Sequence, residues 1–215
     1  MGKKAIGLAG RQDVIERLLT AHAAWFNVER DHVFAGRTFP GYAEFHSTAS
    51  QYVLVKRAKL WEASSHEYLF FCEMSHLDGA ALDDLVGFMT GDALAKVQLS
   101  PEHMSSYLTL VVVADSVSEN IPRQVRQTRF RKNFMLGLKG WADLRVAVVD
   151  LGGGQVFVNS QGKPLKETLA ANAFLEGVPV RAMGEGAVVA AVPALAADGA
   201  ATGEASAARV SQRQA

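Results

Sequence analysis

The residues best suited to chemistry are carboxylates and histidines between positions 42 and 67. Glu44 and His46 alternate in a segment that we expect to be a short strand, residues 42–48, so both side chains lie on one face. A Glu-x-His pair on a strand can ligate a metal or shuttle a proton. Two such groups do not complete a site, so the pair by itself defines no activity.

A second group of carboxylates lies in the stretch 51–74, which is predicted to form two strands joined by a turn at 63–66. In that register Glu62 lies opposite Glu67, a like-charge contact that is unfavourable without a nearby cation. The cation could be His66, an arginine from elsewhere or a metal. The alternative is that the two carboxylates are splayed and solvated at the turn.

Glu44, His46, Glu62 and Glu67 are therefore the candidate catalytic residues. No complete catalytic constellation accompanies them, because the sequence contains no Gly-x-Ser-x-Gly motif, no His-Glu-x-x-His motif and no pair of cysteines. The single cysteine, Cys72, lies in an apolar strand pattern, which favours a buried inert thiol. The sequence predicts no metal site and no cofactor, and it favours a protein that is not an enzyme.

A cluster of basic residues follows residue 119 in a protein whose total charge is otherwise balanced. Six cations occur between positions 123 and 139, and no acidic residue lies among them. Arginines at this spacing can hold phosphates or carboxylates through bidentate hydrogen bonds. The alternative is a solvated helix whose arginines pair with acidic residues of neighbouring elements. The candidate anion-binding residues are Arg123, Arg126, Arg129, Arg131 and Lys132.

Total charge gives no argument for a nucleic-acid or membrane partner, because 22 basic residues balance 22 acidic ones. The expected partner is an anionic ligand or a protein, and a nucleic acid is a further alternative that the total charge does not support. No apolar run approaches the roughly 20 residues that span a bilayer, and the N-terminal apolar run is too short for a signal peptide. These features predict a cytoplasmic protein with no membrane partner.

Periodicity and turn residues predict which elements position these groups. The run 107–114 is continuously apolar and β-branched, which is typical of a central strand buried on both faces. The glycines at 152–154 precede another strand, which favours a hairpin turn over a phosphate-binding loop. The expected helices are 12–26, 77–97, 118–128 and 165–175, and the expected strands are 42–48, 51–62, 67–74, 107–114, 134–138, 144–151 and 155–159.

These elements predict one α+β domain over residues 1–177. We expect a mainly antiparallel sheet with a central buried strand and three to four packing helices, in the order α-β-β-β-α-β-α-β-β-β-α. Residues 178–215 are rich in Ala and Gly, lack aromatic residues and show no stable period. They are predicted to form a disordered tail.

The element order over residues 12–128 is similar to the αβββαβ core of restriction-endonuclease-like nucleases. Those enzymes carry a Glu-x-Lys or Gln-x-Lys on the third core strand, whereas here Leu69 and Ser75 stand two places after Glu67 and Glu73. No family is therefore assigned. Two functions stay open: a non-enzymatic binding or assembly domain whose basic helix contacts an anionic partner, and a metal-dependent hydrolase or phosphodiesterase.

Overall fold

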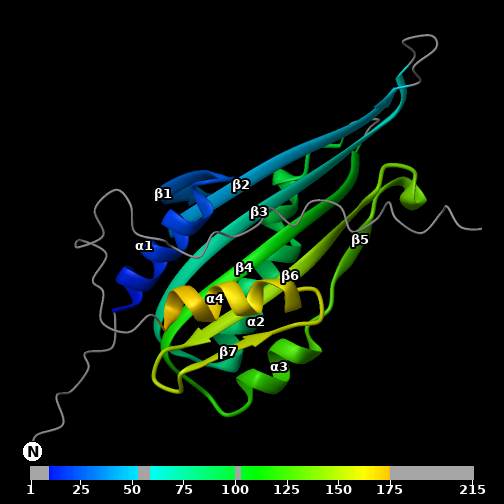
Figure 1. Cartoon of the computed structure of the whole chain (residues 1–215). Helices are drawn as coiled ribbons and strands as arrows, with labels where there is room; N and C mark the ends of the chain where they lie inside the picture. The colour runs from blue at the N-terminus through cyan, green and yellow to red at the C-terminus, as the bar shows by residue number, and fades with distance from the viewer. Residues whose placement is uncertain (1–9, 53–58, 100–102, 175–215) are drawn as a thin grey trace, which may run out of the picture.

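The computed structural model describes residues 10–52, 59–99 and 103–174, with the backbone alone at 47–52, 59–65 and 103–104. Four α-helices and seven strands lie within these ranges (Figure 1). The helices are α1 (Arg11–His22), α2 (Gly79–Thr90), α3 (Ile121–Gln127) and α4 (Lys166–Ala173). The strands are β1 (Asn27–Phe34), β2 (Arg37–Tyr52), β3 (Lys59–Leu77), β4 (His103–Val117), β5 (Arg131–Asn133), β6 (Trp141–Asp150) and β7 (Gln155–Val158). Short 3-10 helices are η1 (Asp92–Lys96), η2 (Met135–Gly137) and η3 (Lys163–Leu165).

The strands form one mixed sheet in the order β1-β2-β3-β4-β6-β5, with β7 also paired to β6. The expected α+β class agrees with this structure. The expected strands 42–48 and 51–62 were not separate strands, because β2 covers residues 37–52. The expectation of a mainly antiparallel sheet was wrong, because β4 pairs in parallel with both β3 and β6. The cause lies in the connections, since α2 joins β3 to β4, and α3 with β5 joins β4 to β6.

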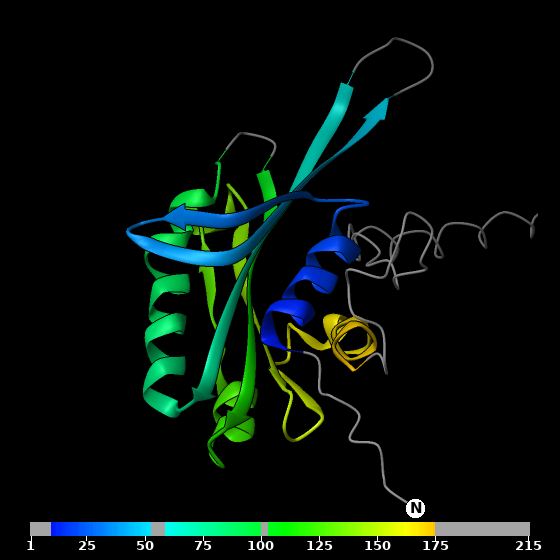
Figure 2. The same ribbon diagram turned by 90° about the vertical axis from the view of Figure 1, so that its left-hand side faces the viewer.

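Helices cover both faces of the sheet, so the described part of the chain has three layers (Figure 2). One apolar cluster lies between the sheet and α2 and α3, and a second lies between the sheet and α1 and α4. β4 contributes to both, with Val112 in the first cluster and Val113 in the second. The prediction of a central strand buried on both faces is confirmed, and the strand extends beyond 107–114 at both ends.

The predicted hairpin turn at 63–66 was wrong, because β3 runs through these residues without a break. Backbone pairing aligns Glu62 with Ser50 and Glu67 with Phe45, so the two carboxylates do not face each other across a turn. The sequence Ala-Ser-Ser-His offers no glycine or proline for a tight turn, and β4 pairs with β3 along it. Residues 53–58, which connect β2 to β3, lie outside the described residues.

No element was expected between the helix 12–26 and the strand 42–48, but the segment 27–41 forms β1 and the start of β2. Ala35 and Gly36 connect these strands with positive φ angles of 47° and 75°, which suit a tight hairpin turn. Phe39 is buried in the core from this segment. Gly41 allows α1 to pack closely, since a Cβ there would lie 2.7 Å from the side chain of Leu19.

Among the described helices, only α2 has a side-chain cap at its start. Asp78 accepts a hydrogen bond from the Ala81 amide at 2.8 Å, as its position before α2 predicts. The third helix begins at Ile121 rather than at residue 118, because Ser116 belongs to β4 and its hydroxyl lies beside His76 instead of capping a helix.

The C-terminal meander differs from expectation mainly at its first strand. The segment 134–138 forms the turn between β5 and β6, while the expected strand 144–151 corresponds to β6 and 155–159 to β7. The glycines at 152–154 do form a hairpin turn between antiparallel β6 and β7. Cys72 is buried, and burial raises the pKa of its thiol to about 12. The predicted tail, 178–215, lies outside the described residues.

Candidate functional site

Glu44 and His46 share the face of β2 that packs toward α2, where they meet a histidine from β3. The Nδ1 atoms of His46 and His66 lie 2.6 Å apart, and Nε2 of His46 lies 3.7 Å from Oε1 of Glu44. Tyr42 donates a 2.7 Å hydrogen bond to Glu44. Burial, and next the hydrogen bond to Glu44, raise the pKa of Tyr42, so its hydroxyl stays a donor. These groups form a small polar cluster in which at least one imidazole is neutral.

Glu67 points to the opposite face of the sheet, together with Leu69 and Phe71, and so lies apart from the histidine cluster. Its carboxylate forms an ion pair with Arg145 of β6, with Oε1 and Nη1 3.2 Å apart and both side chains buried. Burial raises the pKa of Glu67, and the Arg145 guanidinium opposes that rise. The Glu62 side chain is outside the described part of the chain.

Residues that the sequence analysis did not select surround this buried pair. The Arg145 guanidinium lies 3.7 Å from the centre of the Tyr107 ring, and Thr109 is fully buried beside them on β4. Among the described residues, Nε of Arg145 and the hydroxyl of Thr109 have no hydrogen-bond partner, and Nη1 of Arg145 has only the ion-pair contact with Glu67. The sequence held one signal for this pair. Arg145 lies in a largely apolar stretch of β6, and a buried arginine requires a counter-charge.

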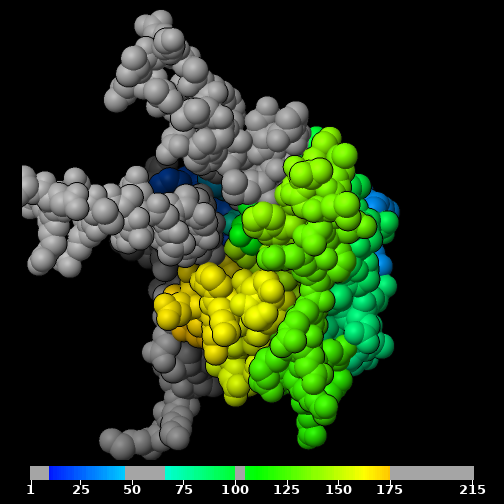
Figure 3. Space-filling view, turned by 90° about the vertical axis from the view of Figure 1, so that its right-hand side faces the viewer, coloured from blue at the N-terminus to red at the C-terminus, as the bar shows by residue number. Residues whose placement is uncertain are grey.

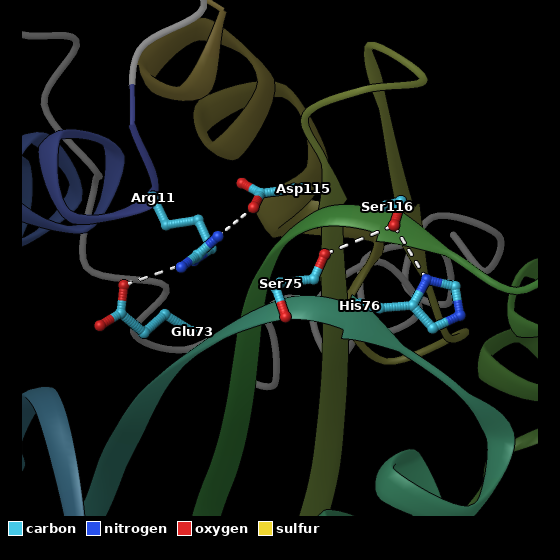
Figure 4. A network of polar contacts seen from close by, with 6 residues as sticks. All are labelled: Arg11, Glu73, Ser75, His76, Asp115 and Ser116. Atoms are coloured by element: carbon cyan, nitrogen blue, oxygen red, sulfur yellow. Dashed lines mark hydrogen bonds and ion pairs between the residues drawn. The ribbon is translucent and has the colours of Figure 1, made fainter.

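A different polar network joins the carboxyl ends of β3 and β4 to the start of α1 (Figure 4). Arg11, the first residue of α1, lies between two carboxylates. Its guanidinium contacts Asp115, and its Nε lies 3.6 Å from Oε2 of Glu73. The carboxyl ends of parallel strands often hold catalytic groups, but here one guanidinium neutralises both acids. This arrangement fastens α1 to the sheet.

On the other side of the same strand ends, His76 lies beside Ser116 (Figure 4). Its Nδ1 is 2.8 Å from the Ser116 hydroxyl and its Nε2 is 3.0 Å from the Ser118 hydroxyl. The Ser116 hydroxyl also lies 3.4 Å from the Ser75 carbonyl oxygen. A Ser-His-Asp triad needs a carboxylate bonded to the imidazole, and both nitrogens of His76 already face serines. The cluster is therefore an exposed hydrogen-bond network rather than a triad.

The predicted catalytic residues are thus dispersed. Glu44 and His46 lie on the α2 face of the sheet, and Glu67 lies on the α1 face. In the ranges that the structure describes, no three His, Cys, Asp or Glu side chains group so that they could hold a metal ion.

Four of the five predicted anion-binding residues form an exposed basic surface along one edge of the molecule. Arg123 and Arg126 project from α3, Arg129 follows it, and Lys132 lies on β5. None of the four forms an ion pair within the described residues. Figure 3 faces this edge, with the α3 region below and the turn after β5 at the top. We call these four residues the basic surface.

Arg131 behaves differently from its neighbours. It donates two hydrogen bonds to the buried Asp143 carboxylate, from Nε at 2.7 Å and from Nη2 at 2.6 Å. The hydrogen bond to Asp143 is the main cause that raises the pKa of Arg131. Its guanidinium also lies over the Trp141 ring at 5.4 Å. Arg131 therefore serves the β5–β6 pairing, and the prediction that it binds an external anion is not supported.

Fold and site together define an α+β protein whose mixed sheet carries helices on both faces. The chain belongs to the family described as Domain of unknown function (DUF8052), whose model matches residues 10–171. That range runs from the start of α1 into α4. No curated protein and no solved structure matches the chain. Among the described helices, none is long and apolar enough to cross a membrane.

Proposed function

We propose that this protein is a non-enzymatic, cytoplasmic binding or assembly domain that contacts an anionic partner through its basic surface. The observation that carries the proposal is the set of four exposed cations on α3, on β5 and between them, none of which forms an ion pair with another described residue. Cations of one sign gathered at one edge attract an anionic partner and orient its approach. Three of the four are arginines, which bind carboxylates and phosphates in bidentate geometry.

The basic surface stands on a fixed platform. Ile121 and Val125 of α3 are fully buried. Gln124 donates hydrogen bonds to the Gly79 carbonyl oxygen at 2.9 Å and to the Asp83 carboxylate at 2.7 Å, which ties α3 to α2. A helix held in this way presents its cations in one arrangement, so binding loses less conformational entropy.

The metal-dependent hydrolase is the less well supported alternative. Its candidate residues would have to meet at one site, and Glu44 and Glu67 lie on opposite faces of the sheet. The histidine cluster offers Glu44, His46 and His66, but two of its nitrogens already face each other at 2.6 Å. Calorimetry with Mg²⁺, Mn²⁺ and Zn²⁺ tests the alternative, and stoichiometric binding of one of these ions would favour it.

The binding of fluorescent polyglutamate to the full chain tests the proposal. The variant R126Q/R129Q removes two charges of the basic surface, and K163Q/K166Q removes two exposed charges near α4 as a matched control. We expect the first variant to weaken binding about tenfold at low salt and the second to weaken it less than about twofold. Equal losses in the two variants would show that only total charge matters and would refute the basic surface as the site.

A further inference from the structure

The turn between β5 and β6 exposes three large apolar side chains. Met135 is 62% exposed, Leu136 100% and Leu138 82%. Single exposed apolar residues are ordinary on a protein surface, but three within four positions at the end of a hairpin form a patch. Figure 1 shows this turn at the upper right, beyond the end of β5. We call Met135, Leu136 and Leu138 the apolar tip.

The backbone of the turn is bent against the preference of these residues. Met135 and Leu136 have φ angles of 47° and 56°, in the left-handed region that suits glycine or asparagine. Side chains of this size gain no packing in return, because they are exposed. A strained conformation at a surface patch points to a function for the presented side chains.

Most of the amide groups of the turn are already satisfied inside it. Five backbone hydrogen bonds of 2.9–3.2 Å close the turn, from the amides of Phe134, Gly137, Leu138, Lys139 and Gly140 to carbonyl oxygens between residues 134 and 140. An unsatisfied amide is what makes an irregular segment costly to remove from water. The amides of Met135 and Leu136 are not among these five, so entry of the turn into an apolar medium would expose two amides rather than seven to the loss of water.

Cations lie directly behind the apolar tip. Arg129 and Lys132 are exposed, and Lys132 is on β5 three residues before Met135. Three residues of extended chain span at most roughly 10 Å, so the backbone of Lys132 is no farther than that from the backbone of Met135. Interfacial segments bury their apolar side to roughly 5–10 Å, so this cation would lie at the level of lipid headgroups.

We propose that the apolar tip and the cations behind it dock this protein on an anionic lipid surface. The inference rests on the proposed function and names the partner of the same basic surface. Leu136 is fully exposed on a convex turn, which suits a fluid medium that needs no matching pocket. The balanced total charge predicted no membrane partner, but anionic lipids attract a local cluster of cations within a Debye length.

Co-sedimentation of the full chain with phosphatidylcholine vesicles, with and without about 30% phosphatidylglycerol, tests the proposal. L136N/L138S makes the tip polar, and V33S is the control at an exposed apolar residue of β1 (68% exposed). We expect the wild type to bind the anionic vesicles and not the neutral ones. The tip variant should bind at least about tenfold more weakly, R129Q/K132Q should also weaken binding, and V33S should leave it unchanged.

A dye on the tip gives a second readout that does not depend on affinity. The only cysteine is buried, so L138C can be labelled selectively with an environment-sensitive fluorophore. A blue shift with anionic vesicles is the expected result. No binding of the wild type to these vesicles, or equal binding by L136N/L138S, would overturn the lipid proposal. If polyglutamate still binds in that case, the proposed function stands and the partner is an acidic protein.

Discussion

Glu67 and Arg145 form a buried ion pair across the centre of the sheet, although β4 lies between their two strands. Glu67 is aligned with Tyr107 and Arg145 with Thr109, so the guanidinium reaches diagonally over the Tyr107 ring. The two side chains are only 4% and 6% exposed, and their Oε1 and Nη1 atoms lie 3.2 Å apart. The pair connects β3 to β6 through side chains, in addition to the backbone pairing through β4.

Removing one partner of this pair should destabilise the protein strongly. E67Q would leave the Arg145 charge buried without compensation, which costs about 3–5 kcal/mol of unfolding free energy. The double variant E67L/R145M removes both charges and keeps apolar volume, so its stability should be close to that of the wild type. Urea denaturation of the single and double variants measures the coupling. If the unfolding free energy lost in the double variant equalled the sum of the losses in the two single variants, this account would be contradicted.

The raised pKa of Glu67 predicts the sign of a pH effect. A carboxyl group whose pKa is higher in the folded state holds its proton more tightly there, so the folded state binds more protons. The stability that this group contributes is present below its unfolded pKa of about 4.3 and is lost as the pH rises through the folded pKa.

Comparison with E67L/R145M isolates this effect from the other carboxylates. The unfolding free energy of the wild type, relative to that of the double variant, should fall as the pH rises from about 4. Urea denaturation of both proteins across about pH 4 to 8 provides the measurement. A relative stability that rises over this range would mean that the pKa of Glu67 is lowered, not raised.

The sequence predicted element types well, because apolar periodicity reports local burial. The continuous apolar run of β4 is a local signal, and it occurs in the structure as a buried strand, as expected. The sequence did not predict that β4 pairs in parallel, since strand direction depends on where the crossover helices pack. It also placed the end of the strand before residue 63 wrongly, because twelve residues of β2 pair with β3. On its other side β3 pairs with β4, which is distant in sequence.

The candidate site was harder to predict than the fold. Glu44 and His46 share a face, as period-2 alternation requires, and they meet His66. The pairing of Glu67 with Arg145 joins residues that are 78 positions apart, and no local pattern encodes that contact. The contact of Arg131 was equally hard to predict from local patterns, because its partner Asp143 comes from the neighbouring strand β6.

Arg131 and Arg129 should respond differently to the same substitution. R131Q removes two hydrogen bonds from the buried Asp143 carboxylate and should cost about 2 kcal/mol of unfolding free energy. R129Q changes an exposed side chain without an ion pair and should change stability by less than about 0.5 kcal/mol. Thermal and urea denaturation compare them. Equal stability of the two variants would mean that the Arg131–Asp143 contact does not support the fold.

Gly152 packs closely against the carboxyl end of β4, and Gly87 in α2 provides a control without such a contact. A Cβ on Gly152 would lie 2.5 Å from the Asp115 carbonyl oxygen, which is backbone and already accepts a hydrogen bond from the Gly152 amide. G152A should therefore cost about 1–3 kcal/mol. Gly87 lies within α2 with no neighbouring atom within 4 Å of a built Cβ, so G87A should stabilise the protein by up to about 1 kcal/mol.

The opposite signs make this pair informative, because both substitutions add the same methyl group. Urea denaturation midpoints with unchanged slopes would assign the difference to the folded state. If G152A were neutral, the β6–β7 turn could move away from Asp115 without loss. The contact between the Gly152 amide and the end of β4 would then contribute nothing to holding the carboxyl ends of the parallel strands together.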